Sequence, residues 1–117
     1  MREKRVVQKP WGREEIWAET IDYVAKRMYL NPGQRMSLQY HETKEETIFV
    51  LSGILRIWKS KADQDYIDLG PGESFHVKPL QVHRFGSPKD AKYATVLMEV
   101  STPHLDDIVR LDDDYNR

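Results

Sequence analysis

Short apolar stretches alternate with polar breaks along almost the whole chain. Each stretch is rich in β-branched, aromatic or other apolar residues and is bounded by Gly, Pro, Asn, Asp or Ser, which is typical of β-strands. No helical period persists through this part of the chain, so many short strands in one small domain favour an all-β sandwich or barrel. We expect strands at residues 15–18, 23–30, 36–41, 47–51, 54–58, 66–69, 74–77, 82–85 and 93–100.

The breaks between the stretches predict the connections. Ser52-Gly53 separates two apolar runs and predicts a tight hairpin turn, and the polar residues 62–65 predict a second hairpin loop. Only the C-terminal end of the chain has a pattern compatible with a helix. Residues 104–111 follow Pro103 and carry aspartates near their start, so they predict either a short helix or an irregular strap.

Length and composition narrow the class of protein. The chain has 117 residues, which predicts a single domain over 1–117. It has no cysteine, which excludes a disulfide framework and a thiolate metal site and fits a cytoplasmic protein. No apolar run is long enough for a transmembrane helix, and no secretory signal is visible. The net charge of −1, with acids and bases interspersed, gives no nucleic-acid footprint.

Four polar side chains stand where strands would bring them together. Gln39 and His41 are two residues apart, so they project from one face of a strand. Glu46 opens the next apolar run, and a strand returning beside the first would bring it level with His41. His83 lies in another short strand-like run. Two imidazoles, a carboxylate and an amide oxygen suit one divalent ion, of which Zn, Mn, Fe, Co and Ni are the candidates.

A purely structural role for these four residues is the competing interpretation, because single histidines in strands are more often structural than ligating. The turn signals on both sides favour a site. They are Asn31-Pro32-Gly33 before the first pair, Ser52-Gly53 after Glu46, and Gly70-Pro71-Gly72 before His83.

The strand over 36–41 also predicts which residues accompany the metal ligands. Arg35 and Ser37 share a face with Gln39, whereas Met36 and Leu38 share the other, apolar face. A cation on the metal-facing side is costly unless it meets an anion or a carboxylate. Arg35 therefore either binds an anionic ligand or forms a salt bridge to Glu46, Glu73 or Glu99.

These residues resemble the two motifs of the cupin superfamily, over residues 32–53 and 72–83. Gln39 takes the place of the usual first histidine, and the spacing from Glu46 to Gly53 is kept. Nearly the whole chain resembles the C-terminal cupin domain of type II mannose-6-phosphate isomerase/mannose-1-phosphate guanylyltransferase. The matching segments are 9–12 (KPWG), 38–41 (LQYH), 106–110 (DDIVR) and 113–117 (DDYNR).

The resemblance implies a cupin-type double-stranded β-helix, or jelly-roll barrel, with zinc as the first metal to expect. It implies a metal-dependent isomerase of a sugar phosphate such as mannose 6-phosphate, and a homodimer. Arg35 and Lys44 are the catalytic candidates, as a cationic clamp for the phosphate. Lys44 stands where the family usually has arginine, and Thr43 and Thr47 also depart from its pattern. No guanylyltransferase chemistry is expected from this segment.

Two other functions remain open at this point. The chain could be another small cupin metalloenzyme that acts on sugars, such as an epimerase, lyase or dioxygenase. It could also be a cupin that binds a metal and a sugar without catalysis, because the fold does not decide the reaction.

Overall fold

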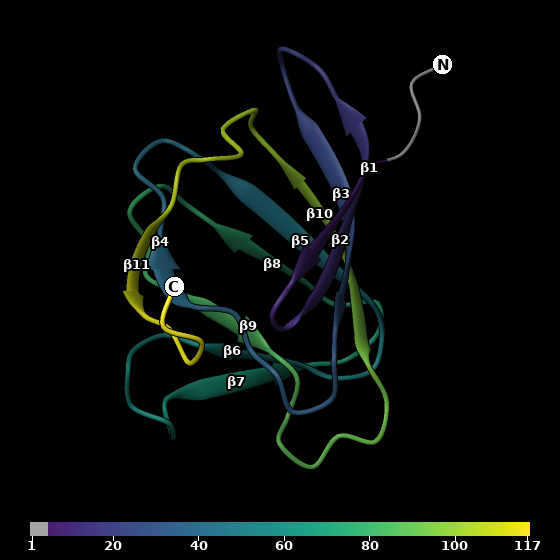
Figure 1. Ribbon diagram of the computed structural model, residues 1–117, viewed down its shortest axis with the longest axis vertical. Helices are drawn as coiled ribbons and strands as arrows, with labels where there is room; N and C mark the ends of the chain where they lie inside the picture. Colours follow the sequence, from purple (N-terminus) through teal and green to yellow (C-terminus); the bar gives the residue numbers. More distant parts are fainter. Residues whose placement is uncertain (1–4) are drawn as a thin grey trace.

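The computed structural model describes residues 5–117, which form strands and loops without a helix (Figure 1). The prediction of an all-β jelly-roll fold is confirmed. The strands are β1 (Arg5–Lys9), β2 (Gly12–Glu19), β3 (Val24–Leu30), β4 (Leu38–Tyr40), β5 (Glu46–Ser52), β6 (Leu55–Trp58), β7 (Tyr66–Leu69), β8 (Ser74–Val77), β9 (Arg84–Gly86), β10 (Thr95–Ser101) and β11 (Val109–Asp112).

The strands form three antiparallel sheets that enclose one interior. The largest has the order β1-β2-β3-β10-β5-β8, and it faces the sheets β7-β6-β9 and β11-β4 (Figure 1). The hydrophobic core between them includes Met28, Ile48, Ile57, Phe85 and Leu97, which are almost completely buried. Burial of this apolar surface is the main stabilising contribution to the fold.

The inward faces of the large sheet change from apolar to charged along the strands. Burial alternates along β5, so Glu46 lies on the same inward face as Ile48. The same alternation in β10 places Glu99 on the face of Leu97, and Glu99 is paired with Lys26 of β3. One end of the barrel is therefore filled with hydrophobic side chains and the other with buried charges.

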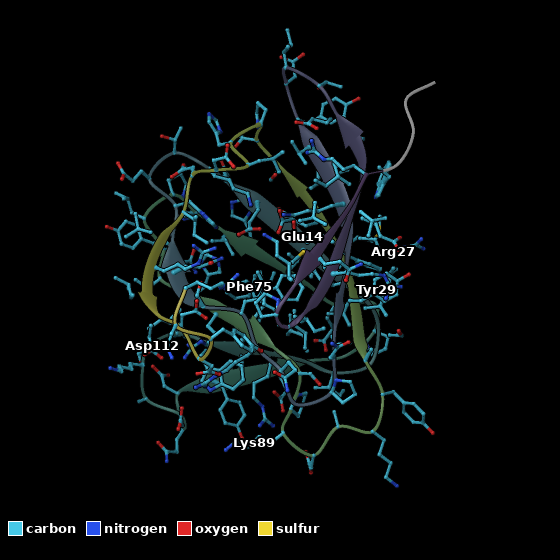
Figure 2. The ribbon with its side chains drawn as sticks, viewed as in Figure 1. Glu14, Arg27, Tyr29, Phe75, Lys89 and Asp112 are labelled. Atoms are coloured by element: carbon cyan, nitrogen blue, oxygen red, sulfur yellow. The ribbon has the colours of Figure 1, made fainter. Side chains whose placement is uncertain are left out.

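Side chains on the outer side of the large sheet are separated from this interior. Figure 2 shows Glu14 and Phe75 between the sheets, whereas Arg27 and Tyr29 lie on the outer side. Arg27 of β3 pairs there with Glu15 of β2, with 2.9 Å between Nη2 and Oε1. The two faces of β3 thus divide an interior charge network from an ordinary surface ion pair.

The Ser52-Gly53 turn does not close a hairpin, so that prediction is wrong. β5 belongs to the six-stranded sheet and β6 to the three-stranded sheet, and the turn is the corner between them. Gly53 has a φ of 76°, and a Cβ at this position would lie 2.8 Å from the carbonyl oxygen of Ala94. The predicted loop over 62–65 does join a hairpin, since β6 and β7 pair antiparallel.

The C-terminal segment is a strap and not a helix, which corrects one of the two structures expected for residues 104–111. Its strand β11 pairs with β4, and the buried Arg84 binds Asp112 of the strap with 3.0 Å between Nη2 and Oδ2. Pairing with β4 satisfies the backbone groups that a short isolated helix would have left exposed.

Within residues 5–117, no helix is present that is long and apolar enough to cross a membrane.

Candidate metal centre

Two histidines converge on one carboxylate at the charged end of the barrel. The Nε2 atom of His41 lies 3.1 Å from Oε1 of Glu46, and the Nε2 atom of His83 lies 3.3 Å from the same oxygen. All three side chains are buried, and their potential ligand atoms lie within 4.8 Å of one another. The structure therefore brings together three of the four metal ligands predicted from the sequence.

Backbone carbonyl groups orient both imidazole rings. Nδ1 of His41 lies 2.5 Å from the carbonyl oxygen of Asp107, and Nδ1 of His83 lies 3.0 Å from that of Gln81. A carbonyl oxygen only accepts, so each Nδ1 must carry the hydrogen. In a neutral ring this leaves the lone pair on Nε2, which is the tautomer that a metal ion needs.

A cation fits the space among these atoms better than the protein atoms alone do. The Nε2 atom of His83 is buried and makes no hydrogen bond. In the neutral tautomer, two nitrogen lone pairs and a carboxylate oxygen would face one another, which is repulsive. A divalent ion bound by His41, Glu46 and His83 would satisfy all three groups, and nitrogen and oxygen ligands suit Zn and its neighbours.

Gln39 stands beside this triad. Its backbone exchanges two hydrogen bonds with that of His83, each 2.9 Å long, so the two residues are opposite one another. Side chains of directly opposed residues project from the same face. The hydroxyl group of Ser37 donates to Oε1 of Gln39 at 2.8 Å, which orients this amide oxygen and leaves its second lone pair for a metal.

The four residues are assembled across the barrel and not within one hairpin. We expected Glu46 to return on a strand beside His41, but β5 pairs with β10 and β8 and belongs to the other large layer. His41 directly follows β4, and β4 pairs with β11 and with His83. Glu46 therefore meets the histidines from the opposite wall of the barrel.

Buried charges extend the site away from the histidines. Nζ of Lys44 lies 3.1 Å from Oε2 of Glu99 and 3.7 Å from Oε2 of Glu46. Nζ of Lys26 lies 3.6 Å from the same oxygen of Glu99 and 3.1 Å from Oε2 of Glu14. Three carboxyl groups and two ammonium groups thus form one continuous network.

The network shifts the protonation of its members. Burial, and then the Glu46 carboxylate, raises the pKa of Glu99 to about 7, despite the two lysines. Burial alone would raise the pKa of Glu46, but the Glu99 carboxyl group, the two histidines and the Lys44 ammonium group around it hold that pKa well below its usual range. Burial opposes the charge of Lys44, yet Glu99 and Glu46 outweigh it and raise the Lys44 pKa. Glu46 is therefore the carboxylate available to a metal.

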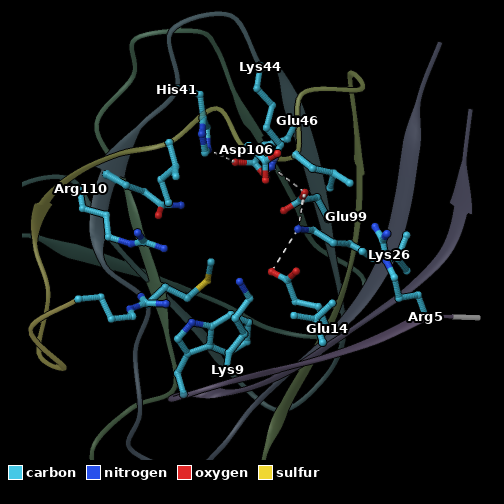
Figure 3. A pocket seen from close by; sticks show the side chains of 18 residues that line it. Arg5, Lys9, Glu14, Lys26, His41, Lys44, Glu46, Glu99, Asp106 and Arg110 are labelled. Carbon is cyan, nitrogen blue, oxygen red and sulfur yellow. Dashed lines mark hydrogen bonds and ion pairs between the residues drawn. The ribbon is translucent and has the colours of Figure 1, made fainter. Parts of the chain in front are cut away.

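The site opens into a cavity of about 380 Å³ (Figure 3). Gln39, His41 and Glu46 line it, and Glu14 and Glu99 form a second part of its wall, whereas His83 is not among the lining residues. A volume of this size suits a small organic ligand. The metal-ligand set is thus next to a space where such a ligand could lie.

The sequence of this chain matches the model of a known protein family. The model described as mannose-6-phosphate isomerase C-terminal matches residues 1–113. The chain belongs to this family. The resemblance that the sequence motifs indicated is therefore confirmed.

Curated relatives of this family are much longer proteins. Mannose-1-phosphate guanylyltransferase of Escherichia coli is 32% identical over 116 residues, which are 97% of this chain and 23% of the relative. Alginate biosynthesis protein AlgA of Pseudomonas aeruginosa is 30% identical over 114 residues, covering 95% of this chain and 23% of the relative. The chain thus spans about a quarter of the length of these family relatives.

Solved structures of other proteins share this fold. An RmlC-like cupin from Shewanella frigidimarina has a TM-score of 0.70 and 17% identity, over 86% of this chain and 85% of that one. The polyketide cyclase RemF from Streptomyces resistomycificus has a TM-score of 0.76 and 16% identity, over 93% and 79% of the two chains. At such identities the likeness establishes the double-stranded β-helix fold alone.

Arg35 does not face the metal centre, which corrects the expectation from strand alternation. It lines a separate cavity of about 360 Å³ with Trp58 and Asp63. Its guanidinium donates to both carboxylate oxygens of Asp114, with Nε 2.7 Å from Oδ2 and Nη2 3.0 Å from Oδ1. The regular strand begins only at Leu38, so the alternation does not extend back to Arg35.

Lys44, the other catalytic candidate, does line the cavity beside the candidate metal ligands. Its ammonium group is held by Glu99 and Glu46 and is almost completely buried. Its place favours charge balance beside the metal ligands over the phosphate clamp that the sequence predicted.

Sequence reasoning gave no role to several residues of the site. Asp107 orients His41, Lys26 and Glu14 complete the charge network, and Arg110 lines the cavity. Asp107 and Arg110 lie in the family's closing motif, 106–110, which was a signal that this segment matters. A helix over 104–111 would not have placed them at the site, because it is the pairing with β4 that turns this segment toward the cavity.

Proposed function

We propose that this chain is a metal-dependent isomerase that interconverts the aldose and ketose forms of a sugar phosphate. One divalent ion, with zinc as the first candidate, would be held by Gln39, His41, Glu46 and His83. The observation that carries the proposal is the convergence of two Nε2 atoms on one Glu46 oxygen, at 3.1 and 3.3 Å, beside a cavity.

Aldose–ketose interconversion moves a proton between adjacent carbons through an enediol. When bound, the metal supplies a Lewis acid for the negative charge that develops on the sugar oxygen. The chain's own residues would carry the proton, and Glu99, Glu14 and Asp106 are candidates, because their carboxyl groups line the cavity beside the ligand set. Lys44 and Lys26 hold the carboxyl groups of Glu99 and Glu14 in position.

The comparisons support the choice of substrate class. The family description names mannose-6-phosphate isomerase, and one relative is called mannose-1-phosphate guanylyltransferase. Both descriptions refer to phosphorylated mannose, so mannose 6-phosphate is the first substrate to test. A homodimer and a cytoplasmic location remain predictions, and a light-scattering mass of twice the monomer mass would confirm the dimer.

The proposal is tested by metal analysis of the purified protein, followed by an assay against aldose and ketose phosphates. We expect about one divalent ion per chain and interconversion of mannose 6-phosphate with its ketose. His83→Ala should abolish metal binding and turnover while the protein stays folded. His76→Ala is the matched control, because His76 lies at the surface and pairs with Glu45, with 2.7 Å between Nε2 and Oε2.

Full metal retention in His83→Ala would overturn the metal assignment. A metal-loaded parent that neither binds nor interconverts any sugar phosphate would overturn the isomerase proposal. Turnover of a different sugar substrate would then favour an epimerase, lyase or dioxygenase, and metal and sugar binding without turnover would favour a non-catalytic cupin.

A further inference from the structure

The cavity beside the metal centre has two cationic side chains that no acid neutralises. Among the basic residues that line it, Lys26 and Lys44 belong to the buried network, Arg5 pairs with Glu19, and Arg117 pairs with Asp113. Within residues 5–117, the side chains of Lys9 and Arg110 have neither an ion pair nor a hydrogen bond. Both are therefore available to a ligand.

Strand pairing directs Arg110 into the cavity. In the ladder between β11 and β4, Arg110 is directly opposite Gln39. Directly opposed residues project from the same face, and Gln39 itself lines the cavity. Figure 3 shows the Arg110 side chain entering the cavity from the C-terminal strap.

Lys9 approaches from a different wall. It is the last residue of β1, opposite Gly12, and the next residues of the turn place the buried Trp11 in the same cavity wall. In Figure 3 its side chain points into the cavity from the β1 side, away from the strap that carries Arg110. The two cations thus reach one space from separate segments of the chain.

The other two lysines of the cavity are already engaged by carboxyl groups. Lys26 pairs with Glu14 and Glu99, and Lys44 pairs with Glu46 and Glu99, so neither ammonium group is free for a ligand. An anionic group on a ligand is therefore favoured near Lys9 and Arg110. A guanidinium group can bind two phosphate oxygens at once, and a lysine adds a point charge.

We propose that Arg110 and Lys9 form the anion subsite of this cavity and hold the phosphate group of the sugar phosphate. The inference rests on the proposed function, because it assigns that function's phosphate to a place. Arg110 and Lys9 thus take the phosphate-binding role that the sequence suggested for Arg35, whose side chain is bound to Asp114 in a separate cavity. The sugar end of the ligand then lies toward the metal-ligand set.

The test is calorimetric binding of mannose 6-phosphate, mannose, glucuronate and inorganic phosphate to zinc-loaded and zinc-free protein. Arg110→Gln and Lys9→Gln should each weaken binding of mannose 6-phosphate by about ten-fold or more, as expected for a lost charge-assisted contact. Zinc content and mannose binding should not change. Arg110→Lys should bind with intermediate affinity, because it keeps the charge and loses the fork.

Two further variants control for charge and for the sequence-based alternative. Arg56→Gln removes one positive charge from an ion pair with Asp68, outside this cavity, and should bind like the parent. Arg35→Gln should also bind like the parent. If Arg35→Gln weakened binding and Arg110→Gln did not, the inference would be overturned in favour of Arg35.

The outcomes separate this inference from the proposed function. If Arg110→Gln and Lys9→Gln bind mannose 6-phosphate as tightly as the parent does, the subsite assignment is overturned and the isomerase proposal stands. A parent that binds only glucuronate or inorganic phosphate, and loses that binding in both variants, would support the subsite and overturn the sugar-phosphate proposal. A parent that binds none of the anions would overturn both.

Discussion

At the scale of single residues, Asp107 connects the C-terminal strap to the candidate metal centre. Its carboxylate accepts hydrogen bonds from the backbone N–H groups of Glu42, Thr43 and Lys44, at 2.9, 2.7 and 2.8 Å. Its carbonyl oxygen accepts from Nδ1 of His41. One residue therefore orders the loop between β4 and β5 and also orients His41, a candidate metal ligand.

Removing the Asp107 carboxylate should destabilise the protein in a pH-dependent way. The backbone hydrogen bonds, from Glu42 first, lower the pKa of Asp107 to about 2 from the ordinary 3.8. A lowered folded-state pKa stabilises the protein above the unfolded-state pKa, and this stabilisation is lost as the pH falls through the folded-state pKa. In urea unfolding, Asp107→Ala should be less stable than the parent above about pH 4, with the difference shrinking toward pH 2.

The neighbouring Asp106→Ala is the control, because the Asp106 side chain lines the cavity and has no bond to the loop. It should unfold like the parent across this pH range. Asp107→Ala keeps the backbone carbonyl group that accepts from Nδ1 of His41, so its zinc content should stay close to that of the parent. Equal stability of Asp107→Ala and the parent at pH 7 would contradict the assignment.

At the scale of elements, the corner at Gly53 decides how the sheets meet. The chain leaves β5 in the six-stranded sheet and enters β6 in the three-stranded sheet at this turn. The backbone adopts a φ of 76° there, which residues with a Cβ rarely adopt, and passes close to the segment before β10. The corner thus combines a conformational requirement with a steric one.

Gly53→Ala should cost more stability than Gly72→Ala. Both glycines have positive φ, at 76° and 89°, but a Cβ meets the Ala94 carbonyl oxygen at 2.8 Å only at Gly53, and nothing within 4 Å at Gly72. We expect a loss of about 1 kcal/mol for Gly72→Ala from the backbone conformation alone, and about 2–3 kcal/mol for Gly53→Ala. Denaturant unfolding measures both, and equal losses would show that the close approach is unimportant.

At the scale of the whole molecule, the C-terminal strap closes the barrel beside β4. Arg84 of β9 holds it there, since its Nε donates to the carbonyl oxygen of Met36 at 2.9 Å and its Nη2 donates to the carbonyl and carboxylate oxygens of Asp112. Arg84 is almost completely buried. The position of Arg110 and Asp107 at the site therefore depends on an ion pair elsewhere in the strap.

Arg84→Met should destabilise the whole molecule by about 3 kcal/mol, because it leaves buried oxygen atoms without their donor. Arg56→Met removes a comparable pair with Asp68, which is partly exposed at the surface, and should cost less than about 1 kcal/mol. Thermal and denaturant unfolding distinguish the two. A loss from Arg84→Met as small as that from Arg56→Met would mean that the strap is held by its backbone pairing alone.

Local patterns were sufficient for much of the fold. The period-two alternation and turn residues predicted strands close to β7 and β8 and the hairpin over 62–65, because these depend on neighbouring residues alone. They missed β1, and they predicted a hairpin at Gly53. The alternation of apolar and polar residues along a strand does not identify the sheet in which its partner strand lies.

The sequence by itself determined the cupin motifs and the chemistry of the site, because Gln39, His41, Glu46 and His83 supply nitrogen and oxygen donors wherever they lie. Only the tertiary structure decided that Glu46 meets His41 across the barrel, that Arg35 turns to Asp114, and that Arg110 enters the cavity. Alternation constrains faces within one strand. β4 pairs with β11, and the paired residues Gln39 and Arg110 are 71 residues apart along the chain, so this pairing depends on the packing of all the strands together.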